Sequence, residues 1–196
     1  MNSRFGYSDK IPENLREPFC KLSCHVVNIK QKIILYDQLY MTDENVKILN
    51  NASPTPFKLI KESLATDIMM SIFRLLDPEK SCGKENLSVA FLKNGFSMCS
   101  IQGLNEIFEK LMSLKKQVEP YRHKILAHND LKKVVSPATA TKTNFPWNTL
   151  QEIINLLCAS LNLIYQNFVN AEMIFIPKQR SSGRALIALL KKLKEA

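Results

Sequence analysis

Apolar residues recur at steps of three and four along most of the chain, the spacing that places them on one face of an α-helix. The first such stretch covers residues 13–40, and Pro18 offers an alternative start for it. No run of alternating apolar and polar residues, the signature of a half-buried strand, rises above background. The pattern therefore predicts an all-α fold.

Several helix boundaries can be predicted from capping residues. Thr42 precedes two acidic residues and should cap a short helix through Asn50. Thr55 followed by Pro56 indicates the start of a helix that should end at Asp77. The other expected segments are a loop over 77–86, a short segment over 87–92, a helix over 100–118, a helix begun or kinked by Pro120, a surface loop over 134–147, a long helix over 146–169 and a tail helix over 184–194.

The tail combines leucines on one side with lysines and arginines elsewhere, and Ser181 or Ser182 could cap it. Such a helix can bind a membrane surface or a partner helix, but packing on its own bundle is the favoured interpretation. A length of 196 residues suits one domain. We expect a single domain over 1–196, with a core over about 55–170 and the tail over about 182–195.

The composition is that of an ordinary globular protein, with 45% hydrophobic and 23% charged residues. No stretch approaches the roughly 18 uninterrupted apolar residues of a membrane helix. The first residues also lack the apolar core of a signal peptide. We expect a cytoplasmic protein that does not enter membranes.

The five cysteines are an odd number and are scattered along the chain, which indicates reduced thiols rather than a disulfide framework. Cys20, Cys24 and His25 lie close enough to suggest a metal site, but a second pair of ligands is missing. Burial of the cysteines on a helix face is the favoured alternative. We expect neither a metal nor a cofactor.

The formal charge is +9 and the pI is near 9.3, which favours encounter with polyanions. RNA, DNA and anionic membranes are all such polyanions. A solvated surface on a basic protein explains the charge equally well, because charge alone does not identify a ligand.

Residues 121–130 hold two of the three histidines together with several charged residues. The segment resembles the signature of HEPN domains, an arginine followed by a histidine after four to six positions; here five residues intervene. Its fuller form, Arg-x-Lys-x-x-Ala-His-x-Asp, is similar to the abortive-infection U (AbiU-type) branch of that superfamily. The matching residues are Arg122, Lys124, Ala127, His128 and Asp130, with His123 directly after the arginine.

Residues 73–77 and 86–89 are similar to a preceding helix and helix start of the same branch, so the resemblance covers about residues 57–130. It implies an up-and-down four-helix bundle with additional N-terminal and C-terminal helices. It also implies a homodimeric ribonuclease with RNA as substrate, serving as toxin or effector of an anti-phage (abortive infection) or toxin–antitoxin system. An antitoxin or a nucleotidyltransferase would then be a possible partner.

The residue types suit RNA cleavage without a metal, which needs a proton acceptor for the ribose 2′-hydroxyl and a cation for the phosphate. Histidine titrates near neutral pH, and the planar fork of arginine matches a phosphate. We expect His128 to act as base or acid and Arg122 to hold the phosphate, with His123 and Lys124 assisting.

Asp130 of the motif, and Arg74 and Asp77 earlier in the chain, have other expected roles. Asp130 could orient His128, or Asp130 could simply help to end the helix together with Asn129. Arg74 is expected to form a structural ion pair with Asp77, three residues later.

Helix geometry bears on the oligomeric state. Six residues rise about 9 Å and turn through about 600°, which leaves Arg122 and His128 roughly 120° apart on one helix. Helical side chains lean toward the N-terminus, so Arg122 leans away from His128. An antiparallel pair of such helices would bring Arg122 of each subunit nearer His128 of the other, which argues for a homodimer.

Three functions remain open on the sequence alone. An endoribonuclease is the favoured one. The alternatives are a non-catalytic module of the same fold that binds RNA, a nucleotide or a protein, and a basic adaptor that docks through its tail helix.

Overall fold

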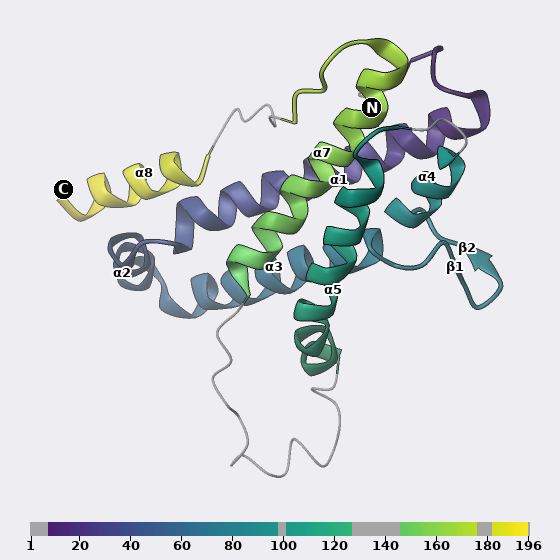
Figure 1. Cartoon of the computed structure of the whole chain (residues 1–196). Coiled ribbons are helices and arrows are strands. Elements are labelled where there is room, and N and C mark those ends of the chain that lie inside the picture. The colour runs from purple at the N-terminus through teal and green to yellow at the C-terminus, as the bar shows by residue number, and fades with distance from the viewer. Residues whose placement is uncertain (1–7, 98–100, 127–145, 176–181, 196) are drawn as a thin grey trace. The chain divides into compact units, whose positions relative to one another are not determined.

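The computed structural model describes residues 8–97, 101–126, 146–175 and 182–195, without the side chains of residues 123–126 and 194–195. Helices form nearly all of its regular structure (Figure 1), and the predicted all-α class is confirmed. The helices are α1 (Glu13–Tyr40), α2 (Asp43–Ala52), α3 (Pro54–Leu75), α4 (Val89–Gly95), α5 (Leu104–Leu126), α7 (Trp147–Val169) and α8 (Gly183–Glu195).

The first two helices form as their sequences predict. The bounds of α1 are those expected from its apolar spacing, and Pro18 lies inside the helix. Thr42 has an extended backbone, and its side chain accepts a hydrogen bond from the backbone N–H of Asn45. This is the N-cap geometry that satisfies one of the free N–H groups at a helix start.

The start and end of α3 both come earlier than expected. The helix begins at Pro54. A proline at the first helical position loses no hydrogen bond, and Pro54 offers this start two residues before Pro56 does. It ends at Leu75, and the chain then makes a tighter turn in which the N–H of Asp77 donates to the carbonyl of Arg74 at 3.4 Å. Asp77 therefore lies just outside the helix.

The expected loop over 77–86 contains a small antiparallel hairpin of β1 (Lys80–Ser81) and β2 (Lys84–Glu85). Cys82 and Gly83 join the strands, and both have positive φ, at 48° and 75°. Two such residues give the tight turn whose twist matches paired strands. The strands are too short to produce a recognisable alternation in the sequence.

A single helix, α5, replaces the two that Pro120 was expected to separate or kink. Proline removes one backbone donor, but α5 continues through Pro120, and residues on both sides of it make contacts. Val118 is buried before the proline, and Arg122 makes side-chain contacts after it.

The chain divides into two compact units. The first comprises Met1–Val26 and Met69–Met173, and in it α5 and α7 pack side by side in opposite directions (Figure 1). The ring of Phe19 stacks on Tyr165, with centroids 6.3 Å apart, and meets Phe96 edge-on at the same distance. Phe96 also contacts Phe168, so aromatic rings join α1, α7 and the end of α4 in one core.

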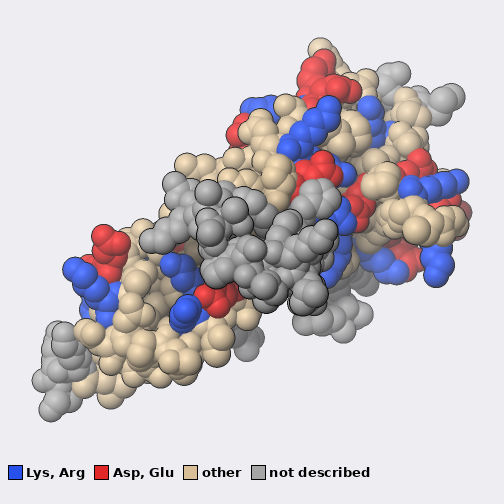
Figure 2. Space-filling view, turned by 90° about the horizontal axis from the view of Figure 1, so that it is seen from below, with Lys and Arg blue, Asp and Glu red and all other residues tan. Residues whose placement is uncertain are grey.

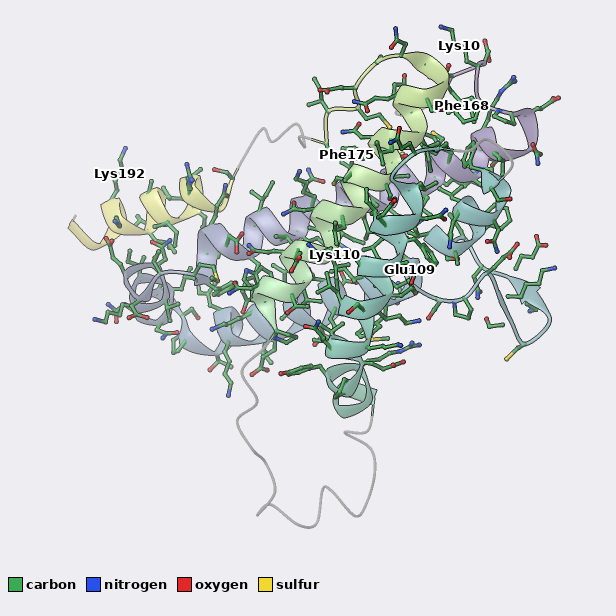
Figure 3. All side chains as sticks on the ribbon, in the orientation of Figure 1. Lys10, Glu109, Lys110, Phe168, Phe175 and Lys192 are labelled. Carbon is green, nitrogen blue, oxygen red and sulfur yellow. The ribbon has the colours of Figure 1, made fainter. Side chains whose placement is uncertain are left out.

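The second unit comprises Val27–Ile68 and Ile174–Ala196. Within it α8 packs against α2, and Lys191 forms an ion pair with Glu44 while Lys192 extends away from α2 (Figure 3). The start of α8 is fixed by the N–H of Gly183, which donates to Gln38 Oε1 at 2.8 Å. The tail helix thus packs on its own chain, as expected.

None of the described helices combines the length and the apolar character needed to cross a membrane. The chain forms two compact units, and the single domain expected from its length remains a prediction.

Candidate functional site

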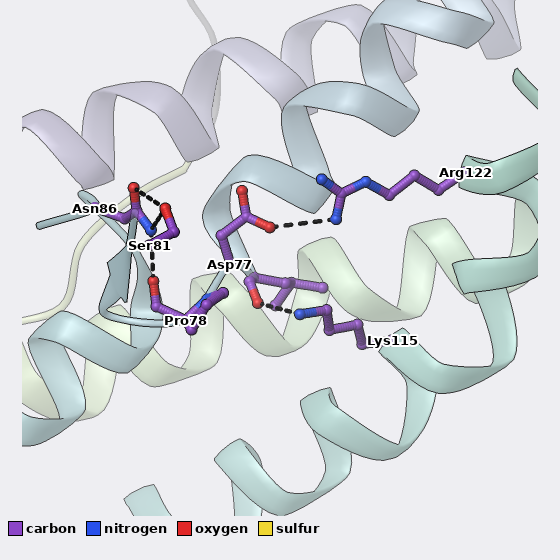
Figure 4. Close-up of polar contacts among 7 residues, drawn as sticks. Asp77, Pro78, Ser81, Asn86, Lys115 and Arg122 are labelled. Atoms are coloured by element: carbon purple, nitrogen blue, oxygen red, sulfur yellow. Dashed lines mark hydrogen bonds and ion pairs between the residues drawn. The ribbon is translucent and has the colours of Figure 1, made fainter. Parts of the chain in front are cut away.

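Two cations of α5 meet the end of α3 within the first unit. Lys115 and Arg122 are seven residues apart, so two helical turns bring them to the same face of α5. Figure 4 shows both side chains extending from α5 toward the segment that follows α3. That segment, Leu76–Pro78, lies in the turn between the helix and the hairpin.

Lys115 binds the backbone of this segment. Its Nζ donates a hydrogen bond to the carbonyl of Leu76 at 2.8 Å (Figure 4). Carbonyls at the end of a helix lack partners within the helix and carry its negative partial charge. The lysine therefore satisfies an acceptor and places a positive charge where the helix favours one.

Arg122 contacts the same segment through its side chain. Its Nη1 donates to Oδ1 of Asp77 at 3.3 Å, with the side chains 29% and 27% exposed. Its Cζ lies 5.3 Å from the ring centroid of Phe73, which is fully buried at the last turns of α3. The guanidinium is thus held at an edge by a carboxylate and over one face by an aromatic ring.

The ion pairs among the described residues include Asp77 with Arg122 and not the expected Arg74 with Asp77. Pairs three residues apart meet only when both lie on the helix surface, and α3 ends before Asp77. The side chain of Arg74 is exposed instead, and the carboxylate of Asp77 binds an arginine 45 residues later in the sequence.

Contacts with the described residues leave donors of Arg122 for another ligand. A guanidinium has five N–H donors, and one of them makes the hydrogen bond to Asp77 within the described part of the chain. The side chain of Arg122 is also partly exposed. A phosphate is the anion whose geometry best matches two parallel N–H groups.

The other residues of the motif are placed only in part. His123 and Lys124 belong to the last turns of α5, but their side chains lie outside the described residues. Ala127, His128, Asn129 and Asp130 lie entirely outside them. Their roles remain the expectations drawn from the sequence.

The cysteines near the N-terminus show no sign of a built site. Cys20 and Cys24 are half-buried on α1, and His25 is exposed. Burial raises the pKa of the Cys20 thiol, and the neighbouring Cys24 raises it further, which disfavours the thiolate that binds metals. Among the described residues, no group of three or more histidines, cysteines or carboxylates is placed to hold a metal ion.

Charges on the described surface are mixed in sign. In Figure 2 the lysines and arginines on the visible face are interspersed with acidic side chains. Opposite charges also form ion pairs on the described surface, such as Lys110 of α5 with Glu152 of α7 at 2.7 Å. On the described part of this face, the cations are scattered among acidic groups and do not form one broad basic patch.

Sequence reasoning missed two members of the site. Phe73 was included in the family resemblance of residues 73–77 without a contact of its own, and Lys115 was not assigned to the site. The spacing of seven residues between Lys115 and Arg122 was the available signal, because it places both on one helix face.

Comparison with known proteins gives a match to one family model. Neither the curated proteins nor the solved structures provide a match. The family model of AbiU2, a family of HEPN domains, matches residues 19–179, which is most of the chain. The match includes α3, α5 and α7 and the whole segment from Phe73 to Asp130. The fold is therefore HEPN-like, the function is of the HEPN type associated with abortive infection, and the chain belongs to the AbiU2 family of HEPN domains.

Proposed function

We propose that this protein is an endoribonuclease that cuts RNA without a metal ion, with Arg122 as phosphate ligand and His128 as proton carrier. The observation that carries the proposal is the state of the Arg122 side chain. Its guanidinium is anchored by Asp77 and Phe73, yet the side chain is partly exposed, and its contacts with the described residues leave donors unused. An arginine with a purely structural role would not need a guanidinium that solvent can reach.

The reaction needs a negative charge stabilised on a phosphate with five oxygen neighbours. The 2′-oxygen loses its proton to a base and attacks the phosphorus, the bond to the 5′-oxygen breaks, and that oxygen gains a proton. Arg122 supplies a permanent charge and two parallel donors at the phosphate. Groups aimed in advance at developing charge make large contributions to rate.

His128 is the proposed proton carrier because imidazole exists in both protonation states near neutral pH. His123 and Lys124, adjacent to Arg122 on α5, would assist by binding the RNA backbone. Asp130 would orient the imidazole of His128, as carboxylates often do for catalytic histidines.

The active unit is proposed to be a homodimer. Arg122 and His128 are six positions apart, which turns their side chains roughly 120° from each other if the helix continues. Two antiparallel copies of this helix would pair Arg122 of one subunit with His128 of the other. A two-fold axis would then create two identical composite sites.

Family membership supports a biological setting for the activity. In an abortive-infection system the protein would be the effector that damages RNA. An antitoxin or nucleotidyltransferase partner would keep it inactive until infection.

Cleavage of single-stranded RNA in the presence of EDTA tests this proposal. The wild-type protein should cut, and Arg122→Ala and His128→Ala should each lower the rate by about 10²-fold or more. Lys116→Ala is the matched control, because it removes an exposed cation of α5 that the motif does not include.

RNA binding measured in parallel separates this proposal from the alternative of a binding module. Both variants should still bind, and binding should weaken with added salt, because scattered cations supply most of the attraction. Wild-type protein that binds RNA but never cuts it would instead support the non-catalytic module.

A further inference from the structure

Asp77 lies where it can control the orientation of Arg122. The segment that carries it is fixed on both sides: Lys115 holds the carbonyl of Leu76 at 2.8 Å, and the side-chain amide of Asn86 holds the carbonyl of Pro78, also at 2.8 Å (Figure 4). Asn86 is fixed in turn, since its amide also donates to Ser81 Oγ at 2.9 Å. The carboxylate of Asp77 is therefore carried by an anchored turn rather than by a free loop.

The contact itself leaves the guanidinium usable. A carboxylate that occupied both donors of an arginine edge would exclude a phosphate from that edge. The 3.3 Å hydrogen bond from a single nitrogen, Nη1, leaves the rest of the fork unoccupied within the described contacts. The ring of Phe73 restricts the same group from one face. The contacts with Asp77 and Phe73 together limit the rotation of the Arg122 side chain, which would otherwise adopt many rotamers.

The ion pair contributes little to folding, because both partners are more than a quarter exposed and solvent screens their attraction. It also opposes simple anion binding, since the negative charge of Asp77 offsets the positive charge of Arg122. A carboxylate that gives little stability and repels RNA is best explained by its effect on geometry.

We propose that Asp77 is a positioning residue: it fixes the Arg122 guanidinium in the orientation that receives the scissile phosphate. This inference rests on the proposed ribonuclease function. The positioning role predicts that a change at Asp77 affects RNA binding and RNA cleavage differently. Loss of the Asp77 charge should leave RNA binding as tight or make it tighter, and should slow cleavage because the phosphate ligand is no longer aligned.

The variant that tests the proposal is Asp77→Asn, which keeps the shape of the side chain and removes its charge. Glu152→Gln is the matched control, because it makes the same chemical change in a carboxylate that pairs with another cation of α5, Lys110. Under single-turnover conditions Asp77→Asn should cut at least about 10-fold more slowly than wild type. Its affinity for an uncleavable 2′-deoxy analogue should not fall, and Glu152→Gln should cut as wild type does.

A second measurement does not depend on activity. The order parameter of the Arg122 Nε–H bond, measured by NMR, should be high in the wild-type protein and in Glu152→Gln, and low in Asp77→Asn. An unchanged order parameter in Asp77→Asn would overturn the proposal whether or not the protein cuts RNA. Lost order with undiminished cleavage would overturn it as well.

The two proposals fail in different ways. If wild-type protein never cuts RNA but Asp77→Asn loosens Arg122, the ribonuclease function is wrong and the hold of Asp77 on Arg122 is supported. If wild-type protein cuts RNA and Asp77→Asn matches it in rate, the ribonuclease function stands and the positioning role is wrong.

Discussion

Arg122 of α5 binds Asp77, which lies 45 residues earlier in the chain, with 3.3 Å between Nη1 and Oδ1. The contact links the first part of the HEPN motif to the turn that follows α3. Since Phe73 contacts the same guanidinium, the two stretches of sequence that resemble the family meet at one side chain. The two stretches are therefore neighbours in the fold.

Mixing two inactive variants tests the homodimeric site. A heterodimer of Arg122→Ala and His128→Ala subunits has one composite site with both residues intact if the sites form between subunits. With random exchange, the mixture should regain about a quarter of wild-type cleavage. Each variant alone should stay inactive. If the mixture is no more active than its components, both residues act within one chain or no composite site exists.

Lys115 should matter for stability more than its neighbour does. Lys115→Met removes the donor for the carbonyl of Leu76, and the loss of such a bond costs about 1 kcal/mol in the free energy of unfolding. For a protein of this size that lowers Tm by roughly 2–4 °C. Lys116→Met, at an exposed position, is the control and should leave Tm nearly unchanged. Equal Tm values for the two variants would contradict the assigned contact.

Local sequence signals were sufficient for much of the fold. The bounds of α1 follow from apolar spacing, and the Thr42 cap follows from residue type, since both depend on residues within a turn or two. The hairpin was missed because its turn residues, Cys82 and Gly83, are not flanked by strands long enough to show a pattern.

The site was less predictable, because it depends on contacts between distant segments. Spacing pointed to Arg74 as the partner of Asp77, but the end of α3 decided against it. The actual partner, Arg122, can be identified only once α5 is placed against the end of α3. Residue type nevertheless selected Arg122 as a candidate, because an arginine near a histidine carries chemical meaning without any contact.

The ion pair between Glu44 and Lys191 predicts a pH effect in the second unit. The hydrogen bond from Lys191, followed by its charge, lowers the pKa of the Glu44 carboxyl below its ordinary value. A lowered pKa in the folded state means that the pair stabilises the docking of α8 above the ordinary glutamate pKa, and that this effect is lost as the pH falls through the lowered value. The pH range concerned is therefore acidic.

Carbon-13 NMR of the Glu44 side chain checks this prediction. The carboxylate should titrate at lower pH in the wild-type protein than in Lys191→Met, where the hydrogen bond is gone. Lys192→Met, a neighbouring lysine that extends away from α2, serves as control and should leave the titration unchanged. Identical titrations in all three proteins would show that the ion pair does not form in solution.

The chemistry of the RNA ends tests the central claim most directly. When the 2′-oxygen attacks the phosphorus, the upstream fragment keeps the phosphate as a 2′,3′-cyclic ester and the downstream fragment begins with a 5′-hydroxyl. Mass spectrometry of fragments produced in EDTA should therefore find these ends with wild-type protein, and their yield should fall at least about 10²-fold with His128→Ala. Fragments ending in a 3′-hydroxyl, or no cleavage of any RNA by the wild-type protein, would contradict the proposed roles of Arg122 and His128.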